Sequence, residues 1–136
     1  MPALLRKFHD ARIARERGEP SNVTLWGSGS PLREFLHADD LASAALQLTD
    51  HDAVGLINVG SGEEISIKEL AAMCAATVRY NGGICWDHSK PDGTPRKLID
   101  SSYARSLGWK PMIGLEEGLR ATYEWFASAT HSGLRL

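Results

Sequence analysis

Short β-prone runs alternate with helical segments along this chain, and this pattern restricts the fold more than any other feature. Four runs have extended character: Val23–Trp26, Glu34–His37, Leu56–Val59 and Ile84–Trp86. Strands that alternate with helices are typical of α/β and α+β folds. Because these strands are few and scattered, they do not encode a complete doubly wound sheet, and a chain of 136 residues suits one compact domain.

Five helical segments fit around these runs. Apolar positions at helical spacing, N-terminal capping residues and flanking glycines or prolines set their expected limits. They are Ala3–Arg17, the segment from an Asp39 or Asp40 N-cap to about Thr49, the segment from a Ser66–Glu69 capping box through Val78, a short helix capped by Asp100 or Ser101 and ended by Gly108, and Leu115–Ala129. We expect the second helix to be well buried, because nearly all of its residues are small or apolar. We expect residues 130–136 to form a loose tail.

Composition and charge exclude several classes of protein. The chain carries 15 basic and 17 acidic side chains, for a net charge of −2, whereas nucleic-acid-binding domains usually show a basic excess. No run approaches the ~18 apolar residues of a membrane span, and the N-terminal residues have the wrong order for a signal peptide. The two cysteines, Cys74 and Cys85, are too few for a disulfide scaffold, so we expect a reducing cytoplasm.

Residues 26–35 form the first candidate ligand-binding segment. Gly27 and Gly29 let a backbone approach a ligand closely, and the guanidinium of Arg33 suits a diphosphate. The segment is neither a Walker A motif, since no Gly-Lys-Ser/Thr follows, nor a dinucleotide fingerprint, since the third glycine is missing. A hairpin loop in which Arg33 pairs with Glu34 or another acid is the alternative interpretation.

Residues 90–97, with the sequence Lys-Pro-Asp-Gly-Thr-Pro-Arg-Lys, form the second candidate segment. Its prolines lower the entropy that is lost when a loop is ordered around a ligand. Arg96 and Lys97 can neutralise a phosphate, and Asp92 can accept hydrogen bonds from hydroxyl or ring N–H groups. A solvated surface turn is the alternative interpretation of this loop.

No catalytic group can be recognised from residue spacing. The five histidines are scattered, and no nucleophile elbow accompanies them. His37 lies beside Asp39 and Asp40, where an acid/base pair is one interpretation and a histidine at a strand end is the simpler one. Cys74 fits core packing within an alanine-rich helix. Of the four tryptophans, Trp26 is the one that we expect in a ligand site, because it adjoins the loop of residues 27–31, called the glycine loop below.

Residues 26–40 resemble the segment by which extended short-chain dehydrogenases that act on nucleotide sugars enter their substrate domain. The shared pattern is Gly-x-Gly, an arginine, an aromatic residue and two aspartates. The 90–97 loop is more specific, and it resembles that of the GDP-L-fucose synthase family, also called GDP-4-keto-6-deoxy-D-mannose epimerase/reductases. Similarity covers roughly residues 2–127, and its other stretches are Pro2–His9, Ile57–Gly62, Leu107–Trp109 and Leu115–Leu119.

The resemblance implies the substrate-binding domain of an extended short-chain dehydrogenase, together with the last elements of an otherwise missing Rossmann domain. It implies that Lys7 and Arg33 hold the diphosphate or the sugar of a GDP-sugar substrate, and that Trp26 lines the nucleotide pocket. Asp92 and Lys97 would contribute from the second loop.

The family's reaction, as the resemblance implies it, epimerises two carbons of GDP-4-keto-6-deoxy-D-mannose and reduces the ketone with NADPH to give GDP-L-fucose. The NADP-binding glycines, the Ser and Tyr-x-x-x-Lys group and the acid/base Cys and His would all precede the region seen here. No tyrosine in this sequence is followed four residues later by lysine. We therefore expect no catalytic, cofactor-binding or metal-binding residue in this chain, and no activity of the chain alone.

Residues 1–129 are thus expected to form the C-terminal nucleotide-sugar-binding region of a cytoplasmic enzyme of nucleotide-sugar metabolism, with no membrane or nucleic-acid partner. Full-length members are expected to be homodimers. The helix that ends near Thr49 and the run from Leu56 would have lost their neighbours, so they should expose apolar surface and make the chain poorly soluble. Two alternatives are a fragment of another nucleotide-sugar epimerase or dehydratase, and a free-standing non-catalytic GDP-sugar-binding module.

Overall fold

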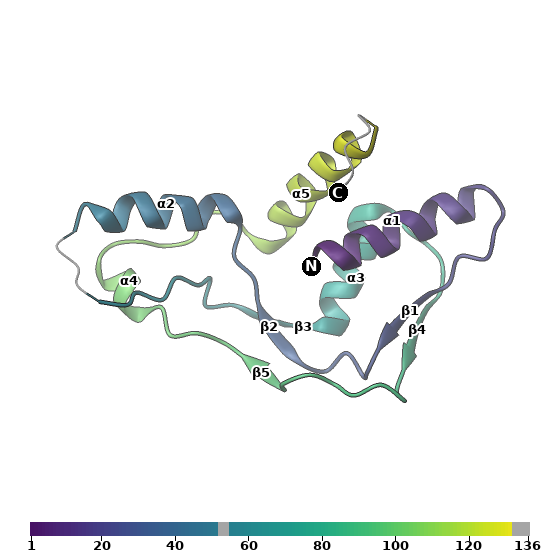
Figure 1. Cartoon of the computed structure of the whole chain (residues 1–136), viewed down its shortest axis with the longest axis horizontal. Coiled ribbons are helices and arrows are strands. Elements are labelled where there is room, and N and C mark those ends of the chain that lie inside the picture. Colours follow the sequence, from purple (N-terminus) through teal and green to yellow (C-terminus); the bar gives the residue numbers. More distant parts are fainter. Residues whose placement is uncertain (52–54, 132–136) are drawn as a thin grey trace.

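A computed structural model describes residues 1–51 and 55–131 of the chain and gives an α/β fold (Figure 1). Its elements in chain order are α1 (Pro2–Glu16), β1 (Val23–Trp26), β2 (Leu32–Glu34), α2 (Ala38–Thr49), β3 (Glu64–Ser66), α3 (Ile67–Val78), β4 (Ile84–Asp87), β5 (Arg96–Lys97), α4 (Ser102–Ser106) and α5 (Leu115–His131). Figure 1 shows α2 and α4 at one end of an elongated molecule, α1, α3, β1 and β4 at the other, and β2, β3 and β5 between them. None of the helices described is long and apolar enough to cross a membrane.

The strands form two small sheets. In one sheet β1 and β4 pair in parallel, with Trp26 opposite Asp87. In the other sheet β2 lies between β3 and β5, antiparallel to β3 and parallel to β5. Because β1 pairs with β4 and β2 pairs with β5, residues 23–34 and 84–97 run side by side along one edge of the molecule (Figure 1).

The larger hydrophobic core lies between α1, α3 and the first sheet. Leu5 and Phe8 of α1 and Leu70 and Cys74 of α3 are each at most 1% exposed. Leu25 of β1 points into the same cluster, which also includes Leu119 of α5. Fully burying a large apolar side chain contributes about 1.5–3 kcal/mol, so these contacts position β1 firmly against α1.

A second, smaller cluster holds α2 and α4 together. Its buried members are Ala44, Leu48, Ala104 and Trp109. Beside it, the buried carboxylate of Asp40 accepts hydrogen bonds from the backbone N–H groups of Met112 and Ile113, each at 3.0 Å. Asp40 therefore ties α2 to the segment that leads into α5.

Several local predictions are confirmed. β1 has the predicted limits, and α1, α3, β4 and α5 lie within two residues of theirs. The capping box of α3 is present, because Ser66 Oγ accepts from Glu69 N at 3.1 Å and Glu69 Oε2 accepts from Ser66 N at 3.0 Å. Desolvation raises the pKa of Cys74 to about 11, as expected for a thiol in the core.

Two predictions about α2 are wrong. Neither Asp39 nor Asp40 is its N-cap, because His37 takes that position and its Nδ1 accepts from Asp39 N at 3.2 Å. The helix is also not well buried, since Leu41 and Leu46 are 53% and 74% exposed. The other expectation, that this helix exposes apolar surface, is confirmed.

Two predicted strands also differ. The extended run expected at Glu34–His37 is replaced by β2 at Leu32–Glu34, where pairing with β3 and β5 fixes the limits. Leu56–Val59 is not a strand, because it pairs with no strand in the described part of the chain. Leu56 is 91% exposed.

The remaining predictions concern α4 and the C-terminal end. Ser101 is the N-cap of α4, but the side-chain hydrogen bond comes from Asp100, whose Oδ1 accepts from Ser102 N at 2.9 Å. Both predicted capping residues are thus used. Of the tail expected at residues 130–136, the first two residues belong to α5, and residues 132–136 lie outside the described residues. Most of the expected turn at His51–Gly55 also lies outside the described residues.

Candidate functional site

Asp92 joins the two candidate segments. Its Oδ1 accepts a hydrogen bond from Ser28 N at 2.8 Å, and its Oδ2 accepts one from Ser28 Oγ at 2.6 Å. The side-chain and backbone hydrogen bonds from Ser28 hold the pKa of Asp92 below its usual value. The glycine loop and the 90–97 loop are therefore in direct contact, although Ser28 and Asp92 are 64 residues apart.

The two glycines of the first segment are required by contacts within the protein. Gly27 and Gly29 have φ angles of 76° and 75°, which favour glycine. A Cβ atom at Gly27 would overlap the carboxylate of Asp92, and one at Gly29 would lie 2.5 Å from the ring of Trp86. The two glycines were predicted to allow the close approach of a ligand, whereas a Cβ atom at either position would meet a side chain of this chain.

Arg33 and Lys97 are opposite each other on β2 and β5. Residues in register on paired strands point to the same face of a sheet, so these two cations share a face. Arg33 Nη1 donates to the carbonyl of Leu32 at 2.6 Å, and Arg33 Nη2 lies 3.2 Å from where a Cβ atom at Gly93 would be. The guanidinium of Arg33 therefore lies against the 90–97 loop.

Arg33 and Arg96 differ in whether a carboxylate of the protein neutralises them. Arg96 forms hydrogen bonds with both carboxylate oxygens of Glu64, at 2.6–2.9 Å, so it is paired within the protein. Glu34 accepts from backbone N–H groups. Among the described residues, neither Arg33 nor Lys97 forms an ion pair, which contradicts the alternative in which Arg33 pairs with Glu34.

Trp26 lies at the end of β1, where the glycine loop begins. Its side chain is 71% exposed, in contrast to Trp109, which is 2% exposed and belongs to the core. The ammonium of Lys90 lies 5.9 Å from the centroid of the Trp26 ring. One residue of the 90–97 loop thus reaches the exposed tryptophan at the start of the glycine loop.

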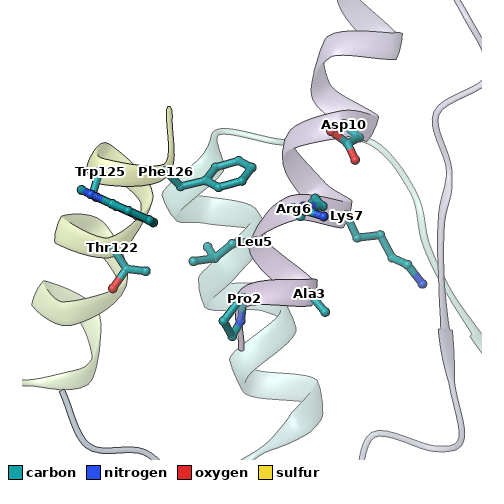
Figure 2. Close-up of a pocket in the computed structure, with 9 residues that line it drawn as sticks. All are labelled: Pro2, Ala3, Leu5, Arg6, Lys7, Asp10, Thr122, Trp125 and Phe126. Atoms are coloured by element: carbon teal, nitrogen blue, oxygen red, sulfur yellow. The ribbon is translucent and has the colours of Figure 1, made fainter. Parts of the chain in front are cut away.

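Lys7 is on α1 and reaches β1. Its Nζ donates to the carbonyl of Thr24 at 2.9 Å. Lys7 also lines a cavity of about 600 Å³ between α1 and α5. Figure 2 shows the Lys7 side chain directed away from α5, whereas Leu5 and Phe126 lie between the two helices. Its ammonium is therefore directed toward β1 and not into the cavity.

The five candidate residues do not line a common cavity. Lys97 lines a separate cavity of about 470 Å³ next to β5, while Trp26, Arg33 and Asp92 line none of the five cavities described. In this chain the region between the two loops is an open surface. It offers cations and an aromatic ring but no enclosure for a reaction.

The histidines provide no catalytic arrangement in the described part of the chain. His37 is the N-cap of α2, a role that neither interpretation of the sequence predicted. His9 Nδ1 lies 3.0 Å from the hydroxyl of Tyr123, in a cluster of aromatic rings with Phe126. No group of three potential ligand side chains that could hold a metal ion occurs among the residues described.

Comparisons with known proteins connect this arrangement to a family. Residues 1–60 match the model of the NAD dependent epimerase/dehydratase family. The probable GDP-L-fucose synthase 1 of Oryza sativa subsp. japonica is 52% identical over 127 residues, which cover 93% of this chain and 38% of that protein. The GDP-L-fucose synthase of Escherichia coli (strain K12) is 45% identical, over 93% of this chain and 41% of that protein. The chain is therefore similar to a part of these GDP-L-fucose synthases.

Solved structures of this group have the same fold. A GDP-L-fucose synthetase from Naegleria fowleri bound to NADP superposes with a TM-score of 0.83 at 26% identity, over 96% of this chain and 40% of that one. A GDP-mannoheptose C4 reductase from Campylobacter jejuni with NADP bound gives 0.82 at 38% identity, over 93% and 44%. The chain thus spans about two fifths of the length of the GDP-L-fucose synthases that it matches. These findings confirm the predicted resemblance and the α/β fold.

Proposed function

We propose that this chain is the GDP-sugar-binding portion of an NADP-dependent GDP-L-fucose synthase, which converts GDP-4-keto-6-deoxy-D-mannose to GDP-L-fucose by epimerisation and reduction. Identity of up to 53% to proteins named GDP-L-fucose synthase supports this function. In the proposed site, Lys7 and Arg33 hold the diphosphate or the sugar, and Trp26 lines the nucleotide pocket. Asp92 and Lys97 belong to the same site.

The observation that carries the proposal is that Arg33 on β2 lies opposite Lys97 on β5. Two cations from segments far apart in the sequence lie in register on adjacent strands, with no carboxylate partner among the described residues. Two adjacent positive charges repel each other, and an anion between them removes that repulsion. A diphosphate also suits the planar fork of Arg33 and the point charge of Lys97.

NADP is part of this proposal, although the residues of this chain do not fit a cofactor site. The sequence contains neither the dinucleotide-binding glycine fingerprint nor a tyrosine followed four residues later by lysine. NADP supplies the hydride for the proposed reduction. We therefore assign the cofactor and the acid/base groups to a portion of the enzyme that is not contained in this chain, which by itself would be inactive.

Two further predictions from the sequence belong to the proposal. A cytoplasmic location is supported by the low cysteine content, and both cysteines are free. Homodimeric assembly of the complete enzyme rests on the family resemblance.

Calorimetric titration of the chain with GDP-mannose and with UDP-glucose tests the proposal. We expect binding of GDP-mannose and at least about tenfold weaker binding of UDP-glucose, because hydrogen bonds that are specific for one base discriminate by about 1.4 kcal/mol or more. Equal affinity for the two ligands would favour a fragment of another nucleotide-sugar enzyme. Absence of binding to both would contradict a nucleotide-sugar site in the isolated chain.

A related GDP-sugar reductase is the second candidate, because the reductase from Campylobacter jejuni that is named for GDP-mannoheptose is 38% identical to this chain. Both candidates predict GDP selectivity, and they differ in the sugar. Competition between GDP-L-fucose and a GDP-heptose for the chain separates them. Preference for the heptose would replace the first candidate by the second.

A further inference from the structure

The glycine loop already binds an anion, and that anion is the side chain of Asp92. Loops with two glycines often direct their backbone N–H groups at a phosphate. Here the N–H of Ser28 and its hydroxyl both donate to the Asp92 carboxylate, at 2.8 and 2.6 Å. Gly27 leaves the space that this carboxylate fills. These donors are therefore not available for a phosphate while the contact persists.

The contact lies at the start of the paired segments that carry the two cations. Ser28 precedes Arg33 by five residues, and Asp92 precedes Lys97 by five residues. Between the contact and the cations, Leu32 N donates to the carbonyl of Pro95 at 2.8 Å. The two segments are thus fixed to each other at the Asp92–Ser28 contact and along β2 and β5. Arg33 is the residue directly after Leu32 in this fixed region.

We propose that Asp92 is a positioning residue, which fixes the glycine loop to the 90–97 loop so that Arg33 and Lys97 lie side by side to bind the diphosphate, and that Asp92 does not itself contact the ligand. This inference rests on the proposed function. It departs from the role in substrate contact that the family resemblance implies for Asp92. A carboxylate next to a diphosphate would repel it, whereas the same carboxylate directed at Ser28 stabilises the loops.

The test uses two substitutions at Asp92. Asp92→Ala removes both hydrogen bonds, whereas Asp92→Asn keeps an acceptor for Ser28 N and an amide that can pair with Ser28 Oγ. Calorimetry with GDP should show about tenfold weaker binding for the alanine variant and less than about threefold for the asparagine variant, as expected for loss or retention of hydrogen bonds. Asp100→Ala is the matched control, because Asp100 also accepts from a nearby serine N–H but lies outside both loops.

A double-mutant cycle with Ser28→Ala distinguishes positioning from ligand contact. If Asp92 acts through Ser28, its replacement by alanine should weaken GDP binding less when Ser28 is already alanine. If Asp92 contacts the ligand, the loss should be the same in both backgrounds. The proposal is overturned if Asp92→Ala weakens GDP binding equally in both backgrounds and Asp92→Asn weakens it as much as Asp92→Ala.

Amide hydrogen exchange without ligand gives a readout that does not depend on nucleotide binding. Asp92→Ala should speed exchange in peptides that cover residues 27–31, while Asp92→Asn and Asp100→Ala should leave those peptides unchanged. Unchanged exchange in Asp92→Ala would overturn the inferred contact even if the chain binds GDP. If exchange responds as expected but the unmodified chain binds no GDP-sugar, the proposed function fails, and the role of Asp92 in binding fails with it.

Discussion

Glu34 Oε1 accepts a hydrogen bond from the backbone N–H of Gly62 at 2.6 Å. Its other carboxylate oxygen accepts from Ile99 N at 3.2 Å. One side chain at the end of β2 therefore holds the turn before β3 and the segment after β5. From the sequence, Glu34 was expected only as a possible partner for Arg33, and the structure shows this different role.

Replacement of Glu34 by alanine should destabilise the chain by about 2 kcal/mol, because hydrogen bonds to charged groups each contribute about 1.5–3 kcal/mol. Urea unfolding followed by circular dichroism measures the change. Glu63→Ala is the control, since Glu63 is an exposed neighbour with the same charge. Equal midpoints for the two variants would show that Glu34 does not hold these segments.

The two thiols should react at very different rates. Cys74 is fully buried and its pKa is raised to about 11, so almost none of it is thiolate at pH 8, whereas Cys85 is exposed. A colorimetric disulfide reagent should modify one thiol rapidly in the native chain and the second only after denaturation. Cys85→Ser should remove the fast phase. Rapid modification of both thiols would contradict the position of Cys74 in the core.

Acid should weaken the sheet through Glu64. Hydrogen bonding to Arg96 holds the pKa of Glu64 below its ordinary value of 4.5, so the stability from this pair is fully present above pH 4.5. It is lost as the pH falls through the lowered pKa of the folded state. Thermal melting between pH 6 and 3 should show a smaller acid-dependent loss in Arg96→Ala than in the unmodified chain. Parallel pH profiles would show that the pair contributes nothing measurable.

The isolated chain should self-associate through α2. Leu46 is 74% exposed, while Leu48 on the same helix is 8% exposed and belongs to the smaller core. Leu46→Glu should lower the average mass in sedimentation experiments at high concentration, because it removes exposed apolar surface. Leu48→Glu should instead unfold the smaller core. A chain that stays monomeric at every concentration, with or without Leu46→Glu, would refute this expectation.

Elements that depend on nearby residues could be predicted from the sequence. The capping box of α3 needs only Ser66 and Glu69, three residues apart, and β1 is set by alternation of four residues that ends at Gly27. The prediction that Arg33, Lys97 and Asp92 bind a ligand rests on two polar loops with glycine and proline, and on a family resemblance that connects these loops.

Features that depend on distant partners could not be predicted. β2 begins at Leu32 because β3 and β5 pair with it there, and Leu56–Val59 has β-forming residues but no partner in the described part of the chain. The same reason explains why the contact between Asp92 and Ser28 could not be predicted. The two residues lie 64 residues apart, and no local pattern marks the contact.

The central claim is that Arg33 and Lys97 together bind the diphosphate of a guanine nucleotide. Calorimetric titration of the chain with GDP measures this directly when Arg33→Ala, Lys97→Ala and the exposed-site control Lys110→Ala are compared. Loss of a charge-assisted hydrogen bond to phosphate costs about 1.5–3 kcal/mol, so the first two variants should each bind GDP at least about tenfold more weakly, with Lys110→Ala unchanged. GDP affinity that is the same in Arg33→Ala and Lys97→Ala as in the unmodified chain would contradict the account.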